Sequence, residues 1–174
     1  MTKLVTLEFF RGSLRFSSGH FTIFSATERE RLHGHNYYLE ASIQAHMGEP
    51  GITFNYEIFR DYLSNLCNQL HLYFLIPTQS PYLIINEIGS NYEVIYNHEK
   101  LIFPKSDTLL LSLANTTLEE LSQWFVEQLV KDSVFIQQHR IKAITIKCFN
   151  GSEHSASAEW KLEDISPKTQ LNLL

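Results

Sequence analysis

The most regular pattern in the sequence is an alternation of apolar and polar positions over residues 36–47. Tyr37, Leu39 and Ile43 are among the apolar or aromatic residues at every second position, and the residues between them, such as Glu40 and Gln44, are mostly polar. Successive side chains of a β-strand point to opposite faces of the sheet. The alternation therefore predicts an antiparallel strand with one buried face.

Other stretches of the chain also predict strands. Residues 4–10 and 13–21 are rich in β-forming residues that alternate in part, and they predict one long first strand with a bend at Arg11 and Gly12. Two more strands are predicted near the end of the chain, at residues 141–149 and 155–162.

Apolar residues at three- and four-residue spacing indicate two amphipathic helices. The first such spacing covers residues 56–70. The second spacing, which starts at Leu118, is announced by Thr116 and Glu119. These two residues form a T-x-x-E pattern typical of an N-terminal capping box. Residues 82–103 lie between the two helices and read as short strands separated by turn-forming residues, so they predict an inserted hairpin.

The order of these elements predicts an α+β fold in which a four-stranded antiparallel sheet carries both helices on one face. The other face needs a cover, and another copy of the chain would supply it. The 174 residues suffice for a single domain with its own core, which we place at residues 1–165. Residues 166–174 form a short tail that we expect to hold no structure of its own.

Composition narrows the classes of partner. The net charge is −5, and no basic stripe is present to neutralise phosphates, so nucleic acid is not an expected partner. Apolar runs are shorter than a membrane span, and the N-terminal residues lack the features of a signal peptide, so we expect a cytoplasmic protein without a membrane partner. Cys67 and Cys148 lie in apolar stretches typical of buried, reduced thiols.

Three histidines are spaced as ligands of one metal ion. His33 and His35 stand two residues apart at the start of a predicted strand, so their imidazoles point to one face. Gly34 adds no side chain between them to block an ion. His20 lies in the preceding strand-like run and meets the pair if the two strands are antiparallel neighbours. Three imidazoles with one open coordination position are typical of a catalytic zinc site.

Four segments, RFSSGHF, LHGHNY, GITFNYEIFRDYL and NTTLEEL, resemble in order and spacing the 6-pyruvoyl-tetrahydropterin synthase and 6-carboxy-tetrahydropterin synthase family. The resemblance implies a tunnelling fold, in which ββααββ subunits assemble into a barrel-like homohexamer of two stacked trimers. It also implies a pterin substrate, usually 7,8-dihydroneopterin triphosphate. The zinc ligands that it implies are His20, His33 and His35.

In that family of lyases, zinc polarises oxygens of the substrate side chain, and a protein base removes a proton from an adjacent carbon. A carboxylate pairs with the amino-pyrimidine edge of the pterin ring. By position, Thr117 and Glu119 match the family's T-x-E element at the ring pocket. Glu119 also has the capping interpretation given above, and the sequence leaves both open.

The candidate base of this chain differs from the cysteine that most of the family uses. Arg29 stands where most of the family has a cysteine, four residues before the first histidine of HGH. Glu30 gives the pattern E-x-x-H-G-H, which resembles a branch that uses glutamate and cuts the side chain toward 6-hydroxymethyl-dihydropterin. A carboxylate beside zinc can serve as a base if burial raises its pKa. The alternating charges of residues 27–31 instead indicate a solvated loop, so Glu30 keeps both interpretations.

Two further positions depart from the family pattern. The family's Asp-His pair is incomplete here, because His71 has no carboxylate beside it to set its tautomer, although it remains a candidate proton shuttle. The principal pterin-binding glutamate is replaced by Cys148. Glu153 substitutes for it only if the loop that carries it folds back.

The residues support three hypotheses. The first is an active zinc-dependent lyase of the glutamate branch, with Glu30 as base and His71 assisting. The second is a 6-carboxy-tetrahydropterin synthase of deazapurine (queuosine) biosynthesis with an unidentified base. The third is a zinc-binding relative that has lost pterin catalysis or binds another small ligand, which the missing residues favour. Three intact ligands with an open position suit catalysis more than structure, so we favour an enzyme.

Overall fold

The structure, a computed structural model, describes residues 3–10 and 12–162. Its strands are β1 (Leu4–Phe9), β2 (Arg15–His20), β3 (His33–His46), β4 (Phe74–Pro77), β5 (Leu83–Ile88), β6 (Asn91–Tyr96), β7 (Glu99–Pro104), β8 (Thr108–Leu111), β9 (Ile141–Phe149) and β10 (Ser155–Lys161). Its helices are α1 (Tyr56–Leu70), the 3-10 helix η1 (Lys105–Asp107), α2 (Leu118–Lys131) and α3 (Ser133–Gln138). Arg11 of the predicted bend, the domain boundary at residue 165 and the predicted tail lie outside the described residues.

The main sheet of the described chain has seven strands. Its order is β10-β9-β3-β2-β4-β8, and β1 pairs with β3 along the same edge as β2. The strands predicted from the sequence are antiparallel, but β4 pairs in parallel with both β2 and β8. The prediction of four antiparallel strands is therefore wrong at this edge. β4 and β8 are short apolar runs without alternation, so they carry no clear strand signal.

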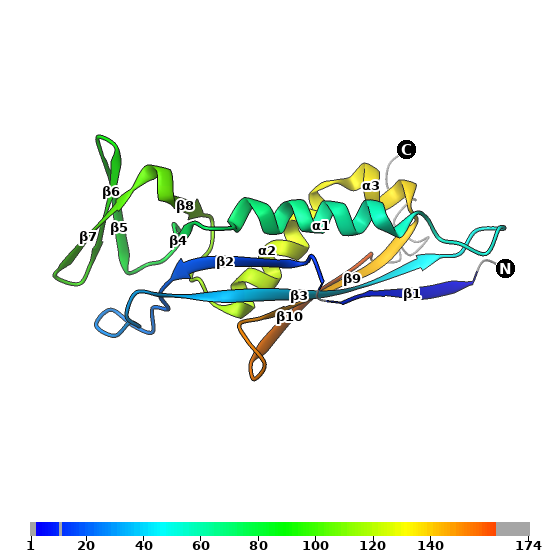
Figure 1. The fold of residues 1–174 in the computed structure, drawn as a ribbon, viewed down its shortest axis with the longest axis horizontal. Helices are drawn as coiled ribbons and strands as arrows, with labels where there is room; N and C mark the ends of the chain where they lie inside the picture. The colour runs from blue at the N-terminus through cyan, green and yellow to red at the C-terminus, as the bar shows by residue number, and fades with distance from the viewer. Residues whose placement is uncertain (1–2, 11, 163–174) are drawn as a thin grey trace, which may run out of the picture.

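β3 runs through the middle of the sheet with the predicted alternation. Leu39 and Ile43 are fully buried, and they face a core that contains Leu63 of α1 and Phe125 of α2. Both helices lie on the same side of the sheet (Figure 1), as predicted. The two cysteines are buried and unbonded, also as predicted. None of the described helices is long and apolar enough to cross a membrane.

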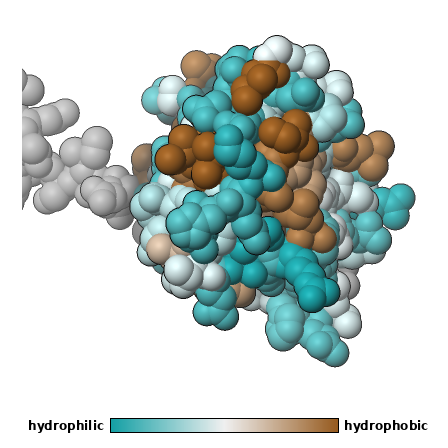
Figure 2. Space-filling model, turned by 90° about the vertical axis from the view of Figure 1, so that its left-hand side faces the viewer, coloured by the Kyte–Doolittle hydropathy of each residue, from teal (hydrophilic) through white to brown (hydrophobic). Residues whose placement is uncertain are grey.

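The segment between α1 and α2 is larger than the predicted hairpin. β5, β6 and β7 form a separate three-stranded antiparallel sheet, here called the inserted sheet. Its turns contain Gly89 and Asn97 at φ of 56° and 52°, and two turns require three strands. The inserted sheet forms one end of the molecule (Figure 1). On that end hydrophobic side chains gather among hydrophilic ones (Figure 2), and Ile84, Ile88 and Ile102 are each at least half exposed.

The capping of α2 is shifted by one residue from the prediction. Thr117 is the N-cap, and its side chain accepts the backbone N–H of Glu120 at 3.4 Å. The carboxylate of Glu120 accepts the backbone N–H of Ala114 at 3.3 Å. Thr116 is fully buried, and Glu119 is exposed on the first turn. Glu120 and not Glu119 therefore stands at the third helical position after the cap, and the capping interpretation of Glu119 is wrong.

Gly19 of β2 permits close packing between β2 and β4. A Cβ at this position would lie 2.4 Å from the ring of Phe74, which stacks on Phe103 with 4.7 Å between ring centroids. We expect Gly19→Ala to lower the free energy of unfolding by about 1–3 kcal/mol, the usual cost of an overpacked core. Urea unfolding curves measure this loss. Adding Phe74→Leu should recover part of it, and an unchanged stability of Gly19→Ala would contradict this packing.

Candidate metal centre

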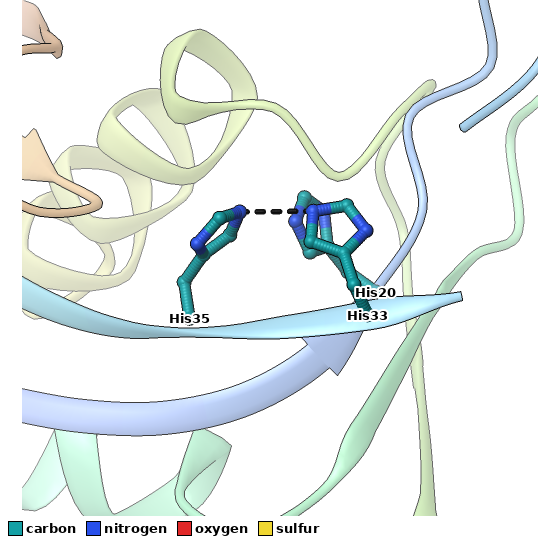
Figure 3. A group of neighbouring side chains, drawn as sticks. All are labelled: His20, His33 and His35. Carbon is teal, nitrogen blue, oxygen red and sulfur yellow. Dashed lines mark hydrogen bonds between the residues drawn. The ribbon is translucent and has the colours of Figure 1, made fainter. Parts of the chain in front are cut away.

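β2 and β3 bring the three predicted imidazoles together. The two strands are antiparallel neighbours, and His20 lies directly opposite His33 in their register. His33 and His35 project from the same side of β3 toward His20 (Figure 3). One ligand atom of each histidine lies within 4.8 Å of the other two. The pairing on which the sequence prediction depended is therefore present.

The cluster lies on the face of the sheet that the helices cover. Tyr37 follows His33 and His35 on the same side of β3, and its ring lies 5.7 Å from that of His35 and 6.0 Å from that of His20 between centroids. His20 is only 5% exposed, whereas His33 and His35 are half-buried. The cluster is thus closed toward the core and open on its other side.

Gly34 does not have the role that the sequence suggested. Its missing side chain would alternate with those of His33 and His35 and so point to the opposite face of the sheet. A Cβ there would lie 3.0 Å from the carbonyl oxygen of Ser18. Glycine at this position therefore allows the close approach of β2 and β3, and does not open a path to the imidazoles.

Backbone carbonyls orient two of the imidazoles. Nδ1 of His20 donates to the carbonyl oxygen of Thr116 at 2.9 Å, and Nδ1 of His33 donates to that of Arg31 at 2.8 Å. With the proton on Nδ1, Nε2 of each ring keeps its lone pair for a ligand. Nothing in the sequence predicted these contacts, because a backbone carbonyl belongs to every residue type.

The Nε2 atoms of the three imidazoles are placed to bind a cation. Nε2 of His20 is buried and has no hydrogen-bond partner in the described part of the chain. Nε2 of His33 and Nε2 of His35 share a hydrogen bond at 2.9 Å, which a bound cation would replace with loss of the shared proton. A cation between the rings would satisfy all three lone pairs at once, and nitrogen donors of this kind suit zinc and its first-row neighbours. The cluster could therefore hold a metal ion.

Burial gives the metal-free protein a pH dependence. It lowers the pKa of His20 from 6.5 to about 4, and the neighbouring His33 and His35 lower this pKa further. Between these two pH values the unfolded chain binds a proton that the folded chain does not. The free energy of unfolding should therefore fall by about 3 kcal/mol as the pH falls from 6.5 to 4, at about 1.4 kcal/mol per pKa unit. Urea unfolding at several pH values measures this, and a curve for His20→Gln parallel to that of the wild type would contradict it.

Glu30 is the carboxylate beside the imidazoles. Its Oε2 lies 3.8 Å from Nε2 of His33 and accepts the backbone N–H of Thr22 at 2.9 Å. Burial raises the pKa of Glu30, but the hydrogen bonds from Thr22 and the nearby imidazoles outweigh this, so the pKa lies below its ordinary value. The raised pKa on which the sequence argument relied is absent. Glu30 is instead a fixed, ionised carboxylate.

His71 is not part of the cluster within one chain. It follows α1, and its Nδ1 accepts the backbone N–H of Ser17 at 3.1 Å. With Ser17, Asn36 and Tyr37 it lines a hollow to which none of the three imidazoles contributes.

Of the other positions considered from the sequence, two lie beside the cluster and two do not. Thr117 and Glu119 stand at the start of α2, directly after Thr116, whose carbonyl holds His20. Cys148 is fully buried on β9, and burial raises the pKa of its thiol well above the usual range. Glu153 is exposed in the turn between β9 and β10, which extends away from the helices (Figure 1), so the loop does not fold back.

Curated sequences similar to the chain share one name. A Pyrococcus horikoshii protein provisionally named 6-carboxy-5,6,7,8-tetrahydropterin synthase is 24% identical over 149 residues, which are 85% of this chain and 87% of that protein. A Pyrococcus abyssi protein with the same provisional name is 27% identical over 124 residues, covering 68% of this chain and 71% of its own.

Solved structures share the fold over most of the chain. The 6-pyruvoyl tetrahydropterin synthase of Plasmodium vivax matches with a TM-score of 0.87 at 22% identity, covering 92% of this chain and 99% of that one. Two further structures of that enzyme, each with a TM-score of 0.86, 22% identity and the same coverage, are of variants in which a glutamate described as a catalytic residue is replaced by cysteine or alanine. The sequence profile of the 6-pyruvoyl tetrahydropterin synthase family matches residues 11–161. Because this match extends over most of the chain, the protein belongs to the 6-pyruvoyl tetrahydropterin synthase family.

Proposed function

We propose that the protein is a zinc-dependent lyase acting on the side chain of 7,8-dihydroneopterin triphosphate or a related pterin. The observation that supports this most is the convergence of three imidazoles with an open side, next to an ionised carboxylate. Three protein ligands and an open position are the usual donor set of catalytic zinc. Membership of the family supports a pterin as the substrate class.

The histidines and Glu30 have different roles in the proposed reaction. Zn²⁺ held by His20, His33 and His35 would polarise the oxygens of the substrate side chain and so make its hydroxyl protons easier to remove. Glu30 takes the proton. Its carboxylate is ionised at neutral pH and so can accept a proton, and the N–H of Thr22 fixes one of its oxygens. For the hydroxymethyl product this proton comes from the 2′-hydroxyl. As it leaves, the C1′–C2′ bond breaks, C2′ departs as the carbonyl carbon of a phosphorylated aldehyde, and Glu30 returns the proton to C1′.

We favour the glutamate branch, which gives 6-hydroxymethyl-dihydropterin. The E-x-x-H-G-H pattern of this chain supports it, since Glu30 lies beside His33. The Plasmodium vivax enzyme, whose named catalytic residue is also a glutamate, supports glutamate as the base. Glutamate in that enzyme and in this chain would then serve the same purpose.

Thr117 and Glu119 are the proposed partners of the pterin ring. They begin the helix beside the cluster, and the capping function falls to Glu120, which leaves the exposed carboxylate of Glu119 for the amino-pyrimidine edge.

His71 would assist only from a neighbouring copy, because within one chain its ring lies with Ser17 away from the imidazoles. We therefore propose a homo-oligomer, a hexamer of two stacked trimers. Light scattering coupled to size-exclusion chromatography measures the molar mass of the oligomer.

A second candidate is the 6-carboxy-tetrahydropterin synthase reaction of deazapurine biosynthesis. The provisional names of the two Pyrococcus relatives favour it. It would need a base other than cysteine, because Arg29 stands where most of the family has that residue.

Product identification separates the candidates. We expect the zinc-loaded protein to convert 7,8-dihydroneopterin triphosphate to 6-hydroxymethyl-dihydropterin, detected by mass spectrometry. A chelator should stop the reaction, and added Zn²⁺ should restore it. Release of 6-carboxy-tetrahydropterin would instead support the second candidate. If no product forms and pterin does not raise the Tm, the protein is a zinc-binding relative without pterin catalysis.

A further inference from the structure

We infer that Arg29, held by Glu99 of the inserted sheet, positions the Glu30 carboxylate beside the imidazoles. The inference rests on the proposed role of Glu30 as the base. It gives the inserted sheet a part in catalysis, although that sheet supplies none of the three histidines.

Arg29 is a largely enclosed cation with partners on several sides. Its side chain is only 16% exposed, and its guanidinium lies 5.4 Å from the ring centroid of Phe21 and 5.7 Å from that of Tyr96. Its Nε donates to Oε2 of Glu99 at 3.0 Å, and its Nη2 pairs with the same oxygen. The planar guanidinium is suited to binding rings and a carboxylate together in this way.

The remaining guanidinium nitrogen connects to Glu30. Nη1 of Arg29 donates to the backbone carbonyl of Glu30 at 2.8 Å. The backbone N–H of Glu30 donates to the carbonyl of Thr22 at 2.8 Å, and the backbone N–H of Thr22 donates to the Glu30 carboxylate at 2.9 Å. The backbone of Glu30 is thus held on both sides. Its carboxylate stands in one orientation, 3.8 Å from His33.

The loop that carries Glu30 is bound to the inserted sheet at a second point. The hydroxyl of Tyr96 on β6 donates to the carbonyl of Ser25 at 2.8 Å. Within the loop, Ile23 and Arg29 form an antiparallel bridge, so the two contacts act on one rigid segment. Tyr96 and Glu99 flank the turn between β6 and β7. That turn therefore sets the place of the loop relative to β3.

Glu99→Gln tests the link with a change of charge and little change of shape. We expect kcat to fall about tenfold with unchanged zinc content and KM, because small displacements of a reacting group carry penalties of this order or larger. Arg29→Lys should cause a similar loss, since an ammonium cannot contact Glu99 and the Glu30 carbonyl together. The matched control is Glu93→Gln, which breaks the 3.0 Å ion pair of Glu93 with Lys100 elsewhere on the inserted sheet and should leave kcat unchanged.

A double-mutant cycle separates positioning from general stability. In a Glu30→Gln background, Glu99→Gln should lower the residual rate no further, because its effect passes through the Glu30 carboxylate. If the rate losses of the two single variants multiply in the double variant, the inference is wrong.

A measurement that does not depend on activity is the exchange rate of the Thr22 amide hydrogen, which should rise in Glu99→Gln and not in Glu93→Gln. An unchanged rate would also overturn the inference. If the wild type turns over no pterin, the proposed function fails while the exchange rates still decide whether Glu99 holds Glu30.

Discussion

Glu30→Gln is expected to lower kcat for 7,8-dihydroneopterin triphosphate by about 10²–10⁴-fold, the range that a general base contributes. Glutamine has nearly the same shape, and its amide oxygen can still accept the Thr22 N–H that Glu30 accepts at 2.9 Å. An amide cannot take up a proton near neutral pH. The loss would therefore report the missing proton transfer and not a misfolded loop. Steady-state kinetics with mass-spectrometric product detection measure it.

Glu28→Gln is the matched control for this variant. Glu28 is exposed on the same loop, and its replacement removes the same charge two residues away. We expect its kcat and the zinc content of both variants to equal those of the wild type. Full activity in Glu30→Gln would remove Glu30 from the mechanism and leave another group as the base.

The imidazole cluster could be predicted because its determinants are local. Alternation along β3 places His33 and His35 on one face, and only one further assumption, the antiparallel pairing of β2 with β3, is needed to add His20. The orientation of the rings could not be predicted in the same way. It depends on the carbonyl oxygens of Thr116 and Arg31, and residue type carries no information about a backbone atom.

The surroundings of the cluster depend on distant contacts, which local patterns miss. The charges of residues 27–31 alternate as in a solvated loop, yet Arg29 is enclosed by partners from the inserted sheet, 70 residues away in the case of Glu99. β4 and β8 are short apolar runs without alternation, and within the described residues they pair in parallel with each other, while β4 pairs at one position with β2, so local patterns do not reveal them either. The base and the sheet edge thus depend on tertiary contacts, whereas the ligands depend on secondary structure.

His20→Ala is expected to weaken zinc binding by more than about 100-fold. Changes in the groups that support metal ligands usually cost about 10–100-fold in affinity, and loss of a ligand should exceed that. His20 is the most buried of the three histidines, and its Nε2 has no other partner among the described residues. The two imidazoles of β3 would remain, but a pair of ligands two residues apart leaves half of a tetrahedral site to water. Competition with a coloured chelator measures the affinity.

His98→Ala provides the histidine control, because His98 is exposed in the turn between β6 and β7, in the inserted sheet. It should bind zinc as the wild type does. Zinc should also raise the Tm of the wild type and of His98→Ala but not that of His20→Ala, since only a ligand bound to the folded state stabilises it. An equal rise in all three proteins would mean that the ion binds elsewhere, and the zinc centre formed by β2 and β3 would then be wrong.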